Sequence, residues 1–311
     1  MLAPICIFII LLFVYVHIRY HIRPGTEPII YELMDPSRAL LHDTIHHKQP
    51  VKFSTSLGDE IGLEWGQIVR THSTYHVNVS GDGGATVVEM PVVGLREGGE
   101  GMDGEDGEDG ADGTGGTDTT TIHTTPTNHH HLLYGNERFI DETSLAEKFT
   151  NVSHMLRPHM MTRATYDLIG SVGSVGSGDT DQPTHTPHTH THTVPTASSA
   201  HITYLICTAG SVNVRLCSGK YTSRICRNAS LAEKISHLSF WDNSGNIVNE
   251  ELLAQIDTQD TVVGPGYAIA IPAHWWYSLE LSPDTSVAML RYRSAMNELA
   301  SLPETVRAMV G

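Results

Sequence analysis

Histidine is the residue type of this chain with the clearest capacity for metal chemistry. The 311 residues include 20 histidines, and four of these alternate with threonine and proline at positions 185, 188, 190 and 192. Imidazoles at such short spacing can chelate a divalent metal. No predicted helix or strand holds this segment, so we expect only adventitious metal binding there. His201 and His274 border predicted strands, and a built site would require both to converge with one histidine of the segment.

The four cysteines give no sign of a disulfide framework. Cys207 and Cys217 fall on consecutive predicted strands, at unequal distances from the turn at 209–211, and no Cys-x-x-Cys pair occurs. Cysteines placed in this way do not face each other, whereas a disulfide needs close, facing Cβ atoms. Cys6 lies in the apolar N-terminus, and Cys226 has no evident partner. The pattern favours a reducing compartment.

The negative charge of the chain is concentrated in one segment. The formal net charge is −16, and Glu97–Asp118 holds nine carboxylates without a lysine or arginine. Such a segment buries too little apolar surface to order itself, so residues 97–130 are predicted to be a disordered insertion. The Gly/Ser/Val-rich and Thr/His-rich residues 170–199 are predicted to be a second one. An acidic chain without a basic patch also disfavours binding of nucleic acid.

The elements that must position any site are concentrated in the C-terminal half. Gly264–Gly266 forms a predicted turn, and Pro272 separates an apolar strand from a second strand that opens with Trp275 and Trp276. These two tryptophans are predicted to point to opposite faces of their strand. Many short strands between Gly and Pro turns predict a barrel or sandwich. The predicted strands are 201–207 and 212–217, joined as a hairpin, then 261–263, 267–271, 275–281 and 286–292.

The N-terminal half is predicted to add a few strands and short helices. Asp35 and Pro36 are expected to cap and begin a helix that carries Leu41 on its apolar stripe. Residues 141–144 are expected to cap a helix at 145–149. The other predicted elements are strands at 50–53, 74–80 and 85–93, a helix at 63–70 with Trp65, and a closing helix at 295–310.

An apolar segment at residues 2–18 predicts a membrane anchor. As a helix it spans roughly 25 Å, against about 30 Å for a bilayer core. Its basic residues, Arg19 and Arg23, follow the apolar segment, which favours an uncleaved single-pass anchor over a cleaved signal peptide. The same arginines predict a soluble domain in the cytosol. Three Asn-x-Ser triplets leave glycosylation on the other side as the alternative; they begin at Asn78, Asn151 and Asn228.

Four stretches, in order, resemble the JmjC-like branch of the cupin superfamily, the cupin-like domain shared with asparaginyl hydroxylases. They are an approach strand at 49–56 followed by Trp65 and the strand 75–79, a short helix around 138–149, a strand pair at 202–216, and the final signature at 264–276. The resemblance covers roughly residues 45–295. It implies a mainly β fold with flanking helices: a cupin-type double-stranded β-helix, or jelly-roll barrel. Active members of the family bind Fe(II) through a His-x-Asp/Glu pair and a distant histidine, with 2-oxoglutarate as cosubstrate.

The ligands that this resemblance implies are missing from the matching positions. Thr196-Ala197-Ser198 stands where the His-x-Asp pair is expected, and Tyr277 stands where the distant histidine is expected. Val212 or Asn213 takes the place of the cosubstrate lysine. We therefore expect no catalytic residue, metal or cofactor.

Two functions follow from this comparison. The leading hypothesis is a membrane-anchored pseudoenzyme that serves as a binding or structural module for an unknown protein or small-molecule ligand, with Tyr277, Trp275 and Arg215 lining its interior. The alternative is an Fe(II)/2-oxoglutarate-dependent hydroxylase with a relocated metal site, for which His274 and His201 are the weak candidate ligands. The expected organisation is an anchor at 2–18, a juxtamembrane segment at 19–48, the cupin-like domain at 49–295 and a C-terminal helix at 296–311.

Overall fold

The computed structural model describes the β-rich body of the chain and its N-terminal helix. The predicted insertion at 97–130, positions 173–190 of the second insertion, most of the helix with Trp65, and the closing helix beyond Ala295 lie outside the described residues. The described residues are 2–22, 25, 27, 29–63, 68, 71–72, 75–81, 86–91, 131–133, 135–158, 162–172, 191–228, 240–241 and 254–295.

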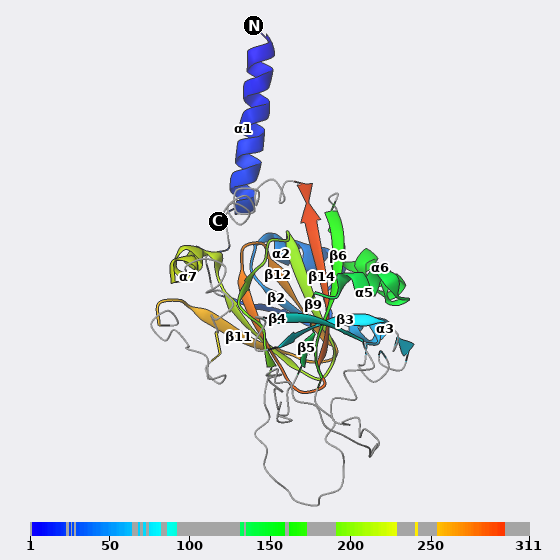
Figure 1. Ribbon diagram of the computed structural model, residues 1–311. Helices are drawn as coiled ribbons and strands as arrows, with labels where there is room; N and C mark the ends of the chain where they lie inside the picture. Colours follow the sequence, from blue (N-terminus) through cyan, green and yellow to red (C-terminus); the bar gives the residue numbers. More distant parts are fainter. Residues whose placement is uncertain are drawn as a thin grey trace, which may run out of the picture.

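The body is mainly β with flanking helices, as predicted (Figure 1). The helices are α1 (Leu2–Ile22), α2 (Arg38–His46), α3 (Leu57–Ile61), α5 (Glu137–Glu142), α6 (Leu145–Leu156), the 3-10 helix η3 (Gly219–Tyr221) and α7 (Thr222–Asn228). The strands are β1 (Tyr31–Leu33), β2 (Val51–Ser54), β3 (His76–Gly81), β4 (Thr86–Pro91), β5 (His131–Leu133), β6 (Thr162–Val172), β7 (Thr191–His192), β8 (Thr196–Ala197), β9 (Ile202–Ala209), β10 (Val212–Cys217), β11 (Thr258–Val263), β12 (Tyr267–Pro272), β13 (Trp276–Leu281) and β14 (Ser286–Ser294).

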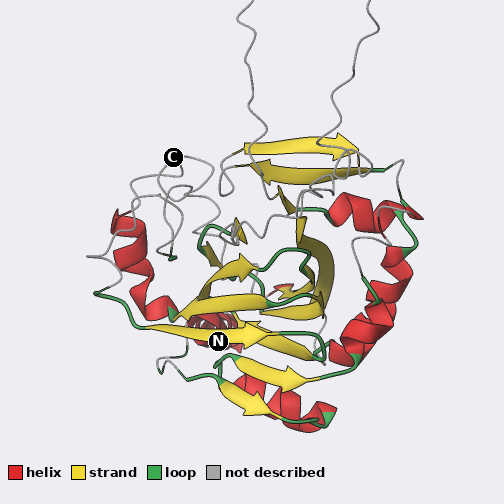
Figure 2. Cartoon of the chain, turned by 90° about the horizontal axis from the view of Figure 1, so that it is seen from below, coloured by secondary structure: helices red, strands yellow, loops and turns green. Residues whose placement is uncertain are grey.

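These strands form two sheets. The larger sheet has nine strands in the order β1-β2-β12-β9-β14-β6-β5-β3-β4. The smaller sheet has the order β11-β10-β13-β7, and β8 also pairs with β13. Helices lie around the periphery of the strands (Figure 2). Strands β6, β7 and β8 fall at the two ends of the range 170–199 that was predicted to be disordered.

The predicted hairpin of β9 and β10 is wrong. β9 pairs with β12 and β14 in the larger sheet, whereas β10 pairs with β11 and β13 in the smaller one. The turn between them explains the change of sheet. Gly210 has a φ of 70°, and a Cβ there would overlap Thr285. The Ser211 N–H donates to Thr285 Oγ1 over 3.2 Å. This bond holds the turn against Thr285 at the point where the chain passes from the larger sheet to the smaller one.

An apolar layer fills the space between the two sheets. Alternation on every central strand places these side chains on the inner faces. All but one of them are fully buried, and Tyr277 is 3 % exposed. We call this cluster the inter-sheet core: Ile169, Leu205, Cys207, Val212, Val214, Leu216, Val263, Ile269, Ile271, Trp275, Tyr277, Leu279, Leu281, Val287 and Met289.

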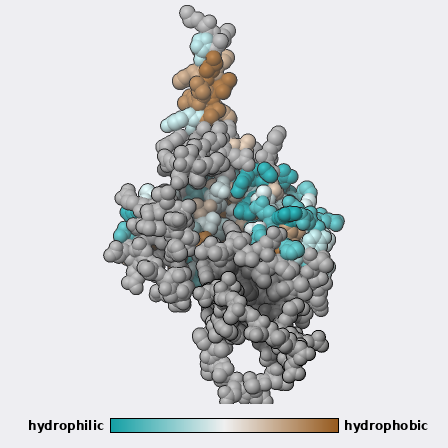
Figure 3. Space-filling model, in the orientation of Figure 1, coloured by the Kyte–Doolittle hydropathy of each residue, from teal (hydrophilic) through white to brown (hydrophobic). Residues whose placement is uncertain are grey.

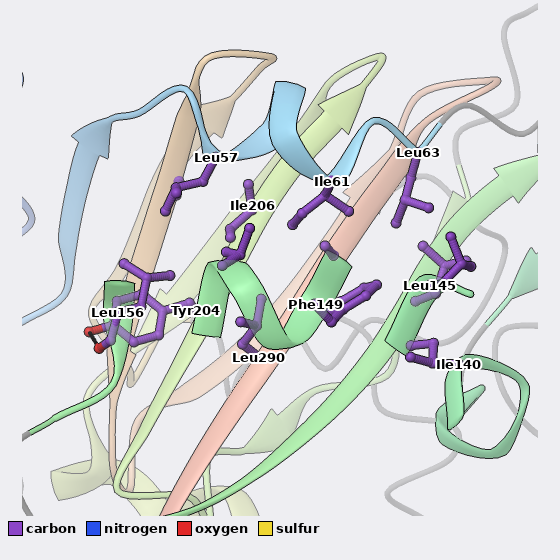
Figure 4. Packing of buried hydrophobic residues seen from close by; sticks show 14 of the residues in the cluster. Leu57, Ile61, Leu63, Ile140, Leu145, Phe149, Leu156, Tyr204, Ile206 and Leu290 are labelled. Carbon is purple, nitrogen blue, oxygen red and sulfur yellow. Dashed lines mark hydrogen bonds between the residues drawn. The ribbon is translucent and has the colours of Figure 1, made fainter. Parts of the chain in front are cut away.

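A second apolar layer lies between the larger sheet and its helices (Figure 4). Helix α6 contributes Leu145, Phe149, Val152 and Leu156, whose spacing keeps them on one helix face. They pack with strand residues such as Tyr204, whose hydroxyl donates to Leu156 O over 3.4 Å. The helix predicted at 145–149 is therefore confirmed, and it continues for seven further residues to Leu156.

The cap predicted for α2 is wrong. Ser37 is the N-cap, and its hydroxyl accepts from Leu40 N over 3.3 Å. Asp35 instead has a φ of 47°, and its N–H donates to Ser54 Oγ over 2.5 Å. Asp35 is thus held in a left-handed turn, which leaves Ser37 in the extended conformation that a cap needs.

Helix α1 extends from one end of the body (Figure 1). Within the part of the chain that the structure describes, no helix combines the length and the apolar character required to cross a membrane. Gly25, three residues beyond α1, is buried, and its carbonyl accepts from Ser218 Oγ over 2.7 Å. A Cβ on Gly25 would overlap Lys48 O, so only glycine fits this contact. We call this the α1 end; there β10 and β14 end, and β6 and β9 begin.

Candidate functional site

The positions at which the resemblance expects iron ligands come together in the structure. Thr196 in β8 and Tyr277 in β13 are direct cross-strand partners. Ser198 follows two residues after Thr196, and its N–H donates to Trp275 O over 2.8 Å. Residues two apart on a strand face the same side, so all three positions face the inter-sheet space near the α1 end. Strand pairing therefore places these three residues side by side.

The side chains at these positions do not fit an iron centre. Ser198 Oγ lies 3.1 Å from Thr203 Oγ1, and Thr196 Oγ1 donates to Val194 O over 3.2 Å. Both hydroxyls thus already have protein partners. Tyr277 is buried beside Leu216, its other cross-strand neighbour. Neutral hydroxyls and a phenol lack the imidazole and carboxylate donors of a two-histidine, one-carboxylate site.

The three residues predicted to line an interior pocket do not share a face. Tyr277 and Trp275 both belong to the inter-sheet core. Arg215 alternates with Val214 and Leu216 on β10, so it points away from that core, on the outer face of the smaller sheet. The structure brings Tyr277 and Trp275 together and separates Arg215 from them. Trp276 packs in a different cluster, with Tyr221 and Ile225, which confirms that the two tryptophans point to opposite faces.

The two weak candidate ligands lie on neighbouring turns. His201 accepts a hydrogen bond from Ala273 N through its carbonyl over 3.2 Å. His274 has a φ of 65°, and its N–H donates to Ser198 O over 2.8 Å. These are backbone contacts that fix the turn between β12 and β13. Among the described residues, no group of three or more His, Cys, Asp or Glu side chains is placed to hold a metal ion.

Arg215 is the centre of a polar and aromatic cluster on the outer face of the smaller sheet. It makes two contacts with Asp260, Nε to Oδ1 over 2.7 Å and Nη2 to Oδ2 over 2.6 Å, and a third with Phe240 O. Its guanidinium lies 4.2 Å from the Trp241 ring. On that ring the His192 imidazole is stacked, with centroids 5.7 Å apart. The bidentate bond to Asp260 raises the pKa of Arg215 further above its ordinary value.

This cluster holds Phe240 and Trp241, which lie in the connection between α7 and β11, against the outer face of the smaller sheet. Trp241 Nε1 donates to Ser278 Oγ over 2.9 Å, and Ser278 Oγ donates to Thr193 O over 2.5 Å. The side-chain donors of Arg215, Trp241 and Ser278 thus all bind acceptors within the protein, which indicates a structural role for the cluster. The sequence prediction missed this cluster because Asp260 and Trp241 are distant from Arg215 along the chain. Arg215 and Asp260 are cross-strand partners, and only the register of β10 and β11 reveals that pairing. His192, predicted to lie in a loop, is held in β7 opposite Glu280.

A second buried polar group connects α5 to the larger sheet. Asp167 is fully buried and accepts from the backbone N–H groups of Asn136 over 2.7 Å and Leu168 over 2.8 Å. Gly135 N and Arg291 Nη2 lie 3.3 and 3.4 Å from its other oxygen. Burial raises the pKa of Asp167, against the opposing effects of Arg291 and the backbone donors. Each oxygen has partners, so this carboxylate is a structural anchor.

The comparisons with known proteins do not assign the chain to a family. No family model matches the chain, and a search of curated proteins finds no match. The function is therefore argued from the geometry described above.

Proposed function

We propose that the chain is a membrane-anchored, cupin-like (JmjC-like) domain protein without oxygenase activity, which serves as a binding or structural module. The observation that carries this proposal is the pairing of Thr196 with Tyr277 beside Ser198. The arrangement of strands supports a shared scaffold, and the three side chains do not supply the donors that Fe(II) requires. The packed inter-sheet core supports the same conclusion, because a catalytic barrel needs room for cosubstrate and substrate.

The order of the strands supports the double-stranded β-helix. From β6 onward the chain alternates between sheets: β6 in the larger, β7 and β8 in the smaller, β9 in the larger, β10 and β11 in the smaller, then β12, β13 and β14 by turns. In the larger sheet the order is β12-β9-β14-β6, and in the smaller β11-β10-β13-β7. Except for β10 and β11, these strands lie beside strands that do not neighbour them in the sequence, as in a jelly roll formed from Greek keys.

The surface of α1 supports the anchor. Its described side chains are apolar and exposed on all sides, from Ile5 at 55 % to Val16 at 53 %, and they appear as the brown segment of Figure 3. A helix that is apolar all round needs an apolar environment on every face, which a bilayer provides. We propose that α1 inserts in a membrane as a single pass, with the β domain on the cytosolic side, next to Arg19 and Arg23.

Two measurements test the proposal separately. Anaerobic Fe(II) titration of the full chain in detergent, followed by assay of succinate release from 2-oxoglutarate, is expected to give neither stoichiometric iron nor turnover. Stoichiometric iron with succinate release would establish the hydroxylase alternative. Extraction of membranes at alkaline pH tests the anchor: we expect the chain to stay in the pellet, and its complete release would show that α1 is not inserted.

A further inference from the structure

The α1 end of the domain carries two like charges side by side. Arg163 in β6 and Arg293 in β14 are direct cross-strand partners, one pair before the end of the ladder. Among the described residues, no carboxylate forms an ion pair with either. Like charges directly opposite on a sheet destabilise it. The pair therefore weakens the isolated fold, and an anion from outside the domain would remove that cost.

Other basic side chains lie at the same end. Arg38 donates to Arg157 O over 2.9 Å, where α6 ends next to the start of β9. Arg224 donates to Gln255 O over 2.6 Å, beside the start of β11, and Lys48 lies against Gly25. The carboxylates described near this end are fewer: Glu27, Asp43 and Asp257 are exposed, and Glu137 pairs with Arg291, two residues before Arg293 on β14.

The side of the domain that carries α3, α5 and α6 has the reverse charge. Lys148 Nζ donates to Ile61 O there, and Arg138 pairs with Glu142 over 2.7 Å. Carboxylates outnumber these two cations; they are Asp59, Glu60, Asp141, Glu142, Glu147 and Asp284. The basic side chains described here therefore gather at the α1 end, and the acidic ones on α3, α5 and α6 and in the turn before β14.

The basic side chains of the α1 end lie close to the point where α1 joins the domain. The buried Gly25 is three positions along the chain from Ile22, which limits the distance between them to about 10 Å. From β2, which begins three residues after Lys48, to Arg163 at the start of β6, the sheet crosses β12, β9 and β14. At about 4.8 Å per strand this edge is about 20 Å wide. Figure 1 shows the ends of β14 and β6 at the same end of the domain as α1.

We propose that the α1 end of the domain docks onto anionic phospholipid head groups, with Arg163 and Arg293 as its central contacts. The proposal rests on the proposed insertion of α1, which would hold this end next to a membrane surface. Phosphate and carboxylate head groups supply the missing counter-charge, and basic side chains within a Debye length of an anionic leaflet are attracted to it. Docking would fix the orientation of the domain on its anchor.

The test uses the full chain in nanodiscs with a fluorophore at the α1 end. Cys6→Ser and Cys226→Ser remove two thiols, and Cys207 and Cys217 are buried. Ser199→Cys then gives one exposed labelling position just before β9. Quenching of the fluorophore by lipids with a nitroxide head group reports contact with the surface. We expect stronger quenching in discs that contain phosphatidylserine than in phosphatidylcholine discs, and loss of the difference at high salt.

Matched variants separate docking from simple proximity. Removal of one arginine is expected to weaken the docked state about fivefold. Arg163→Gln and the double variant with Arg293→Gln should therefore reduce quenching stepwise on anionic discs, without a lower melting temperature, because a like-charge pair is relieved. Arg138→Gln, which removes an exposed arginine of α5 that already pairs with Glu142, should change nothing.

The outcomes distinguish the two proposals. Quenching that is equal on both lipids, or unaffected by the arginine variants, would overturn docking while the anchor stands. Release of the wild-type chain from discs and from alkaline-extracted membranes would overturn the anchor, and docking with it. A lower melting temperature in the double variant would instead assign Arg163 and Arg293 to fold stability.

Discussion

Introducing the ligand set of an active family member tests the proposed cupin-like fold directly. The perturbation is the triple substitution Thr196→His, Ser198→Asp and Tyr277→His. Thr196 and Tyr277 are cross-strand partners, so their Cα atoms are about 5 Å apart, and Ser198 lies about 7 Å along the same face. Imidazoles at directly opposite positions can both reach one ion at about 2.1 Å, with the carboxylate as third ligand. We expect the variant to bind Co(II) or Fe(II) and the wild-type chain not to.

The triple substitution is expected to lower the stability of the metal-free protein. Each polar group placed in the inter-sheet core without a partner costs about 1–3 kcal/mol, so the metal-free variant should unfold at a clearly lower temperature than the wild type. A metal that binds only the folded state returns about 2.7 kcal/mol at a hundred times its dissociation constant. The assay is thermal unfolding with and without Co(II), together with the visible absorption of the bound ion.

A matched control fixes the location of the restored site. Ala197 is exposed and faces the other side of β8, opposite Trp276. Ala197→His in place of Thr196→His should therefore abolish metal binding while it keeps the same number of ligands. A triple variant that folds yet binds no metal, or a control that binds equally well, would refute the assignment of Thr196, Ser198 and Tyr277 to the ligand positions of a cupin-type barrel.

Three further measurements follow from single buried groups. Asp167→Asn should lower the free energy of unfolding in urea by about 2–4 kcal/mol, because an amide N–H₂ would face Gly135 N and Arg291; a change below about 1 kcal/mol would contradict the anchor role. Burial raises the pKa of Cys207 and of Cys217 to about 12, so thiol reagents should label neither until denaturant is added, and labelling of the folded chain would contradict this. Burial, and secondarily Lys148, lowers the pKa of His72 below 6.5. The folded state then binds fewer protons than the unfolded state, so stability should fall as the pH drops through 6.5, and His72→Gln should reduce that slope.

The strands of the C-terminal half could be predicted because turns mark them. Gly264–Gly266, Pro272 and the alternation in 212–217 delimit β10 to β13, and all of these strands are found close to the predicted bounds. The opposite orientation of Trp275 and Trp276 follows from the period of two along an extended segment, and it is confirmed. Local rules are sufficient for such features.

Strand β6 carries a local sequence signal that the predicted strands do not include. It has eleven residues, pairs with β14 along its whole length and contains β-branched and aromatic residues such as Thr165, Tyr166 and Ile169. Gly170 and Ser171 resemble the start of the biased segment that follows, so the end of the strand was assigned to a disordered insertion. A search for period-two alternation from 162 onward would have found it.

The sheet switch between β9 and β10 could not be predicted from local sequence. A two-residue connection with glycine is typical of a hairpin, and such a connection commonly joins paired strands. Here Thr285, 75 residues beyond Gly210, decides the outcome, because its hydroxyl holds the turn in place. The same limit applies to the candidate site: that Thr196 lies opposite Tyr277 depends on strand register, which only the assembled sheet defines.

The distribution of polar groups shows how the inter-sheet space contributes to the stability of the fold. In the inter-sheet space, side chains of β6 and of β9 to β14 meet in one apolar layer, and each fully buried Leu, Ile or Val contributes about 1.5–3 kcal/mol. A metal site in the same place would interrupt that layer with polar ligands that need partners. Hydroxyls at positions 196, 198 and 203 find such partners within the protein itself. The interior therefore stabilises the fold, and on the outer surface at the α1 end Arg163 and Arg293 form no ion pair with any carboxylate that the structure describes.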